Sequence, residues 1–179
     1  RAGGVPVTLQ VSDVFTALQT GALDATEFVS PYNDLAAGYH TVAEYYYYPG
    51  WQEPGPSIEL IINQQAYDSL PDDLIAIVET AARAINQDML DEYTSRNNTA
   101  LVELAKQGVE IRPYPDEIIA VLRQISSEVL AENAARDPMF DKIYRSYDAY
   151  RKNVKAYHEI SEHAYFKIRQ TSSDAVNHD

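Results

Sequence analysis

Residues 44–56 read EYYYYPGWQEPGP, and the predicted fold is organised around them. Four consecutive tyrosines predict a strand with rings on both faces, because successive side chains of a strand alternate. Pro49-Gly50 then ends the strand, since proline donates no N–H and glycine allows positive φ. Trp51, the only tryptophan, and Glu53 project to the same side if the backbone stays extended. Two interpretations stay open: the wall of a pocket for a small polar ligand, or an aromatic core strand that ends in an ordinary turn.

Two short strands with a helix between them are predicted upstream. The strands are expected at residues 6–11 and 23–29, where β-branched residues alternate with polar ones, and the helix at residues 14–19. This order predicts a compact βαβ unit with a parallel pair of strands. Ligands of open α/β sheets gather at the carboxyl ends of the strands, which is where Glu27 and Phe28 fall.

Downstream, the pattern alternates between strands and helices. Residues 57–63 are mostly apolar and predict a buried strand. A long helix is predicted over residues 71–108, with proline and two acids in its first turn and glycine as its C-cap; a break at Asn97-Asn98 is the alternative. A strand at residues 109–114 and a helix at residues 115–137 follow. The sequence therefore predicts an α/β fold.

The last predicted element is one long helix over residues 139–170. Its apolar and aromatic residues are spaced alternately three and four apart: Phe140, Ile143, Tyr147, Tyr150, Val154, Tyr157, Ser161, Ala164 and Ile168. A heptad pattern sustained in this way predicts a helix that packs along a partner helix, as in a homodimer, or that bridges two bodies. The alternative is a helix that wraps its own domain.

Composition excludes several classes of function. The 179 residues carry a formal net charge of −13, which disfavours nucleic acid and anionic membrane surfaces as partners. There is no cysteine, which excludes disulfides and thiolate metal sites in this chain. The four histidines lack the spacing of a zinc site, and the sequence contains no nucleophile elbow.

The chemistry that remains is that of carboxylates, and Glu27 and Glu53 stand out. Each ends or follows a predicted strand, and each is bracketed by aromatic residues or proline instead of lysine. A buried carboxylate without a basic partner must bind a cation, accept several N–H bonds or be protonated. Oxygen ligands select hard cations such as sodium, calcium or magnesium. The alternative is that both are surface acids of an acidic protein.

Four stretches carry a resemblance to a known family. VPVTL at residues 5–9, DVFTALQ at 13–19, GALDATEFVSPY at 21–32 and YYYYPGWQE at 45–53 look like the periplasmic solute-binding subunit of tripartite ATP-independent periplasmic (TRAP) transporters. The last stretch resembles most closely the branch that binds 2-oxo acids and similar monocarboxylates. The resemblance extends to about residue 170.

The resemblance implies a periplasmic-binding-protein-like two-lobe α/β fold, of which this chain would be the carboxy-terminal portion. Residues 1–43 would form the βαβ part of the second lobe. Residues 44–112 would form a hinge strand and part of the first lobe, and residues 113–179 a helical part that includes the long helix 139–170. The chain by itself would expose the edge of the strand at residues 57–63 and would pair with a second copy.

The resemblance also implies a ligand site. Glu27 would be a side-chain metal ligand, and Phe28 would offer its backbone carbonyl to the same cation, sodium or calcium. Trp51 would wall the substrate pocket together with Phe28, and Glu53 would complete the metal or substrate shell. Relatives tend to have tryptophan at position 28, so Phe28 alters the packing of the pocket. The family's arginine clamp for the substrate carboxylate is expected outside this chain, because Arg1 matches it poorly.

The implied function is that of a non-catalytic receptor in the periplasm. It would capture a small organic acid, with a 2-oxo acid such as pyruvate expected, and deliver it to the membrane subunits of a TRAP transporter for import. The long terminal helix resembles one that some members exchange in a homodimer. An alternative from another class is a metal-assisted lyase or hydrolase that uses Glu27 and Glu53.

Overall fold

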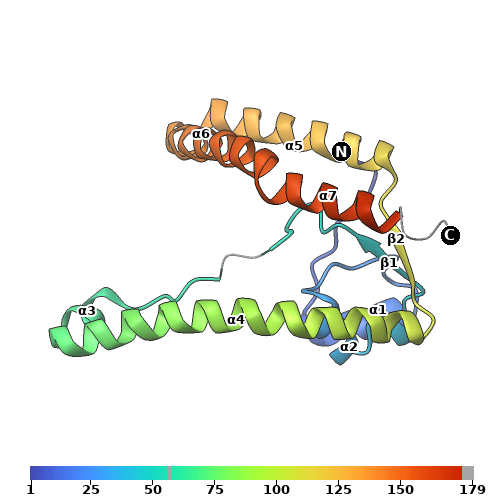
Figure 1. Cartoon of the computed structure of the whole chain (residues 1–179), viewed down its shortest axis with the longest axis horizontal. Coiled ribbons are helices and arrows are strands. Elements are labelled where there is room, and N and C mark those ends of the chain that lie inside the picture. The colour runs from blue at the N-terminus through green and yellow to red at the C-terminus, as the bar shows by residue number, and fades with distance from the viewer. Residues whose placement is uncertain (56–57, 175–179) are drawn as a thin grey trace. The chain divides into compact units, whose positions relative to one another are not determined.

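The computed structural model describes residues 1–55 and 58–174, with side chains through residue 170 (Figure 1). It divides into two compact units. The strand unit comprises Gly3–Ile119, and the helical unit comprises the residues from Ala120 onward together with Arg1 and Ala2. The elements up to the second strand are α1 (Val11–Gln19), α2 (Pro31–Ala36), the 3-10 helix η1 (Tyr39–Thr41), β1 (Tyr45–Tyr48), α3 (Gln64–Asp68), α4 (Asp72–Lys106) and β2 (Glu110–Pro113).

The tyrosine strand is confirmed as β1, which pairs in parallel with β2. Tyr45 lies opposite Glu110, and Tyr48 lies opposite Pro113. On one face of this pair, Tyr45 is 42% exposed and the Arg112 guanidinium lies 4.0 Å above its ring centre. Tyr46 is half-buried on the other face. The rings therefore project to both faces, as the alternation of side chains requires.

The long helix predicted over residues 71–108 is confirmed as α4, a single helix of 35 residues. Asp72 and Asp73 occupy its first turn and Lys106 its last turn, so the charges complement the helix dipole at both ends. Gly108 follows with a φ of 90°, a left-handed conformation that glycine adopts without a steric cost. The chain then turns directly into β2.

The core of the strand unit lies where α2, which also contacts η1, packs on the C-terminal half of α4. In the part of the chain that the structure describes, the buried residues are Asp34, Tyr39, Ala100, Leu104 and Val109. The N–H of Tyr32 donates to Asn97 Oδ1 at 3.0 Å, which ties the start of α2 to α4. Figure 1 shows α2 beside this end of α4.

Leu104 is the residue of this core whose truncation should cost most. Its side chain is 1% exposed, whereas Leu101, on the same helix, is 38% exposed. Leu104→Ala is expected to lower the free energy of unfolding by about 2–5 kcal/mol, because it removes buried methyl groups and leaves a cavity. Urea denaturation followed by circular dichroism measures this, with Leu101→Ala as the control. Equal losses in the two variants would show that Leu104 is not in the core.

Three predicted strands are not formed. Residues 6–11 and 23–29 flank α1, which is confirmed, but neither segment is a strand, so the predicted βαβ unit is wrong for this structure. Residues 58–63 are extended and exposed, with Ile58 at 71% and Ile61 at 81%, while Ser57 lies outside the described residues. A strand forms only when its backbone groups pair with a neighbour. Only β1 and β2 are paired within the described residues.

The helical unit contains α5 (Asp116–Arg136), which begins in the strand unit, α6 (Pro138–Ile160) and α7 (Glu162–Asp174). The helix predicted at residues 115–137 is confirmed as α5. Asp137 caps α6 by accepting hydrogen bonds from the N–H groups of Met139 and Phe140. The ion pair between Arg1 and Glu132 holds the first residues of the chain to α5.

The single helix predicted over residues 139–170 is wrong, because the chain breaks at Ser161 between α6 and α7. The Ser161 hydroxyl donates to the carbonyl of Tyr157 at 2.9 Å, a bond to the preceding turn that bends helices. Four heptad residues of α6 are exposed, whereas Phe140 and Val154 are half-buried: Ile143 is exposed at 61%, Tyr147 at 60%, Tyr150 at 70% and Tyr157 at 65%. We call these four the α6 stripe. No helix in the described residues has the length and apolarity to cross a membrane.

Candidate functional site

The predicted site residues lie on two segments of the strand unit. Glu27 and Phe28 lie in the segment that precedes α2, and Trp51 and Glu53 lie in the loop that follows β1. Burial is the main cause that raises the pKa of Glu27, and the negative charges of Glu53 and Asp34 raise it further. The structure therefore brings the carboxylates of the two segments within electrostatic reach of each other. Their roles as ligands stay predictions.

The two aromatic residues of the predicted site are held differently. Phe28 is half-buried, and its ring meets that of buried Tyr39 edge to face at a centroid distance of 5.2 Å. This contact fixes the ring of Phe28 against the core. The predicted role of Phe28 as a metal ligand needs only its backbone carbonyl. Trp51 is 41% exposed, so its indole presents a large apolar face to solvent. Such a face can line a site that is open at this point.

Sequence reasoning missed a buried pair behind these residues. Asp34, on α2, is 9% exposed, and its Oδ2 accepts a hydrogen bond from the Tyr46 hydroxyl at 2.7 Å. Burial raises the pKa of Asp34 against the opposing effects of the Tyr46 hydroxyl and the Val29 amide. The pKa of Tyr46 is also raised, by burial first and then by Asp34 and Glu27. An acid in a short helix next to a tyrosine strand is the signal that could have revealed the pair.

The donor set fits a hard cation. No Lys, Arg or His forms an ion pair with Glu27, Asp34 or Glu53 within residues 1–55 and 58–170. A cation between Glu27 and Glu53 would relieve the repulsion that raises the pKa of Glu27. Their oxygens and the Phe28 carbonyl are ligands that sodium and calcium prefer. The described residues contain no group of three or more His, Cys, Asp or Glu arranged for a metal, so a complete shell needs further oxygens.

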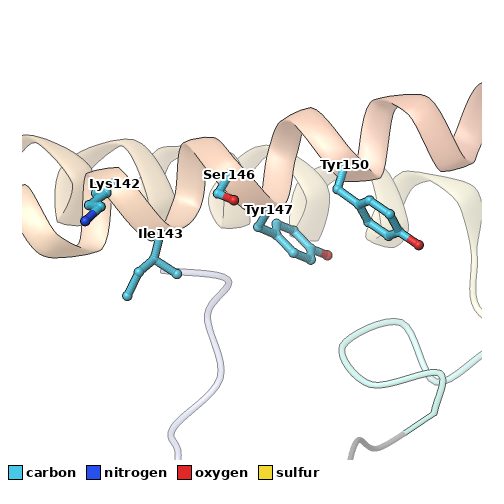
Figure 2. Close-up of a pocket in the computed structure, with 5 residues that line it drawn as sticks. All are labelled: Lys142, Ile143, Ser146, Tyr147 and Tyr150. Atoms are coloured by element: carbon cyan, nitrogen blue, oxygen red, sulfur yellow. The ribbon is translucent and has the colours of Figure 1, made fainter.

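A shallow pocket of about 620 Å³ lies elsewhere, on α6. Its lining is Lys142, Ile143, Ser146, Tyr147 and Tyr150. Figure 2 shows Ile143, Tyr147 and Tyr150 projecting from the same side of the helix. These three residues belong to the α6 stripe, so the pocket is a feature of that stripe and is separate from the carboxylate pair.

Comparison with known proteins places the chain in a defined group. Residues 1–137 match the model of the family described as bacterial extracellular solute-binding protein, family 7 (DctP). The chain is 36% identical over 172 residues to the monocarboxylate 2-oxoacid-binding periplasmic protein of Nostoc sp.. That alignment covers 96% of this chain and 47% of the relative.

Two solved structures share the fold. A TRAP transporter solute-binding protein from Bordetella bronchiseptica RB50 superposes with a TM-score of 0.89 at 28% identity, over 96% of this chain and 51% of that chain. It is a mixed-occupancy dimer, with copurified calcium and picolinate in one active site and the other site apo. A TRAP periplasmic solute-binding protein from Rhodobacter sphaeroides, in an apo open state, gives a TM-score of 0.61 at 26% identity, over 86% of this chain and 49% of that chain.

This chain spans about half the length of these relatives. The likeness confirms the predicted fold class, a periplasmic-binding-protein-like α/β fold. It does not test the division of the chain into lobes or the four predicted site residues, which stay predictions.

Proposed function

Because this chain belongs to family 7 of the bacterial extracellular solute-binding proteins, we propose that it forms part of a periplasmic TRAP receptor for a small monocarboxylate. A 2-oxo acid such as pyruvate is the proposed ligand, and the membrane subunits of the transporter are the proposed partners. The observation that carries the proposal is the 36% identity of this chain to the 2-oxoacid-binding protein of Nostoc sp.. Glu27 and Glu53 stand at the positions that the TRAP resemblance assigns to a cation site.

A bound cation makes the capture of an anion by this acidic chain physically reasonable. The chain has a formal net charge of −13, and Glu27 and Glu53 would repel a carboxylate that approached them directly. A sodium or calcium ion held by both side chains and by the Phe28 carbonyl reverses the local charge. Trp51 then covers an apolar part of the ligand. Calcium is favoured for the first experiments because the Bordetella relative copurified with it.

Calorimetry on the protein encoded by the complete gene tests the ligand class. Pyruvate and 2-oxobutyrate are expected to bind in calcium or sodium buffer and to lose affinity when the cation is removed. Mannitol, which carries no carboxylate, is the negative control, and lactate tests whether the 2-oxo group is needed. Absence of binding by every organic acid would contradict the proposal.

The same titrations address the alternative from another class. The raised pKa of Glu27 is the property that a general acid in a metal-assisted lyase or hydrolase needs. Such an enzyme would produce continuous heat from turnover of a keto acid in the presence of magnesium or zinc. A receptor produces heat that ends when its sites are filled.

We also propose that the receptor is a homodimer through α6. The α6 stripe presents three tyrosines and an isoleucine that are each at least 60% exposed. A second copy of the same helix offers the complementary heptad spacing, and the Bordetella relative is a dimer.

A further inference from the structure

One buried hydrogen bond connects the two segments that carry the predicted ligands. Asp34 follows Glu27 by seven residues, and Tyr46 precedes Glu53 by seven residues. The bond between Asp34 Oδ2 and the Tyr46 hydroxyl, at 2.7 Å, therefore joins α2 to β1 close to both predicted ligands. Asp34 is buried and Tyr46 is at least half-buried, so the bond is shielded from solvent.

The bond between Asp34 and Tyr46 stabilises the fold less than an apolar contact at the same place would. Asp34 has no ion-pair partner among the described residues, and its Oδ1 has no hydrogen bond of ordinary geometry there, although the nearby Val29 amide lowers the pKa of the carboxyl group. A buried carboxylate that is only partly satisfied destabilises a fold by more than a well-packed apolar side chain does. Its presence therefore calls for a role other than packing.

Both ends of the bond stand on rigid supports. On α2, the Asp34 N–H donates to the Ser30 carbonyl at 2.9 Å, which fixes the end of the segment that contains Glu27 and Phe28. Tyr46 is held opposite Ile111 by the pairing of β1 with β2. The bond thus fixes the segment before α2 relative to β1.

We propose that Asp34 and Tyr46 are positioning residues that set the spacing between Glu27 and Glu53. This inference rests on the proposed cation site. In this arrangement neither Asp34 nor Tyr46 touches the cation. The Tyr46 hydroxyl orients the Asp34 carboxylate, and the pair keeps the Glu27 segment and the Glu53 loop at the separation that one cation can bridge.

The first test measures the spacing without any ligand. Nitroxide labels are attached to the double variant Glu27→Cys with Glu53→Cys, in the complete protein with any other cysteines replaced. The 179 residues of this sequence contain no cysteine. Tyr46→Phe, which removes only the hydroxyl, is expected to broaden the distance distribution between the labels. Tyr48→Phe is the matched control, because Tyr48 lies on the same face of β1 and is 48% exposed. It should leave the distribution unchanged.

The second test measures affinity for pyruvate in calcium buffer, with Glu27 and Glu53 intact. Tyr46→Phe is expected to weaken binding about tenfold, the size of effect typical of residues that orient metal ligands. Asp34→Asn keeps an oxygen that accepts from Tyr46, so its loss should be smaller. Tyr48→Phe should bind as the parent protein does.

Three results would overturn the inference. A narrow, unshifted distance distribution in Tyr46→Phe would show that the bond does not set the spacing, whatever it does to the melting temperature. Loss of all binding in Asp34→Asn with normal binding in Tyr46→Phe would make Asp34 itself a ligand. Equal broadening in Tyr48→Phe would show that the broadening does not come from loss of the bond between Asp34 and Tyr46. If no organic acid binds the parent protein, the proposed function fails while the label distances still decide this inference.

Discussion

Glu27→Gln is expected to weaken the binding of pyruvate in calcium buffer by about 100-fold or more, because the variant loses a charged ligand of the proposed cation. A loss of that size corresponds to about 2.7 kcal/mol of binding free energy. Calorimetry on the complete protein measures it. Glu59→Gln is the control, since Glu59 is an exposed acid in the segment at residues 58–63 and its removal changes the net charge equally.

The direction of the change in affinity distinguishes a cation ligand from a surface acid at Glu27. If Glu27 and Glu53 were only surface acids, removal of one negative charge would leave the affinity for an anion unchanged or raise it slightly. Tighter binding in Glu27→Gln would therefore contradict the cation site. Glu53→Gln should behave as Glu27→Gln does, because both carboxylates serve the same ion.

Tyr150→Lys is expected to dissociate the proposed homodimer. Tyr150 is 70% exposed in the single chain and lies at the centre of the α6 stripe. In a dimer the lysine would be buried without a partner, which costs several kcal/mol, on the order of 3–5. Analytical ultracentrifugation measures the change in the monomer–dimer equilibrium.

Ala156→Lys supplies the matched control for that variant. Ala156 is exposed on α6 outside the stripe, so the added charge is the same but stays in water. It should leave the dimer intact. If the parent protein sediments as a monomer with its helical circular dichroism unchanged, the stripe is not a dimer interface.

Local patterns explain most of what could be predicted from the sequence. The helices α4 and α5 carry their own start signals, apolar periodicity and end signals, so their bounds could be found without knowledge of any distant residue. The tyrosine strand also needed only its composition and the Pro49-Gly50 stop. The break at Ser161 was missed because the heptad spacing continues through it, whereas the bond from its hydroxyl to Tyr157 bends the chain.

The failures share a cause, which is dependence on partners far away in the chain. Residues 6–11, 23–29 and 58–63 have the composition of strands, but composition cannot supply a neighbouring strand. The pair of Asp34 and Tyr46 escaped for a similar reason, because it depends on which face of β1 is turned toward α2. Glu27 and Glu53 were grouped by aromatic context and by family resemblance, and only the fold supplies their electrostatic coupling.

The parallel pairing of β1 with β2 has a consequence for how the chain folds. Paired residues of β1 and β2, such as Tyr45 and Glu110, are 65 positions apart, so closing that loop costs about 4 kcal/mol of chain entropy before any strand contact forms. More than half of those residues belong to α4, which forms from local contacts. The helix should therefore fold first and the tyrosine strand dock late. The loop that carries Trp51 and Glu53 depends on that docking, so it should be among the first segments to open by sub-global unfolding.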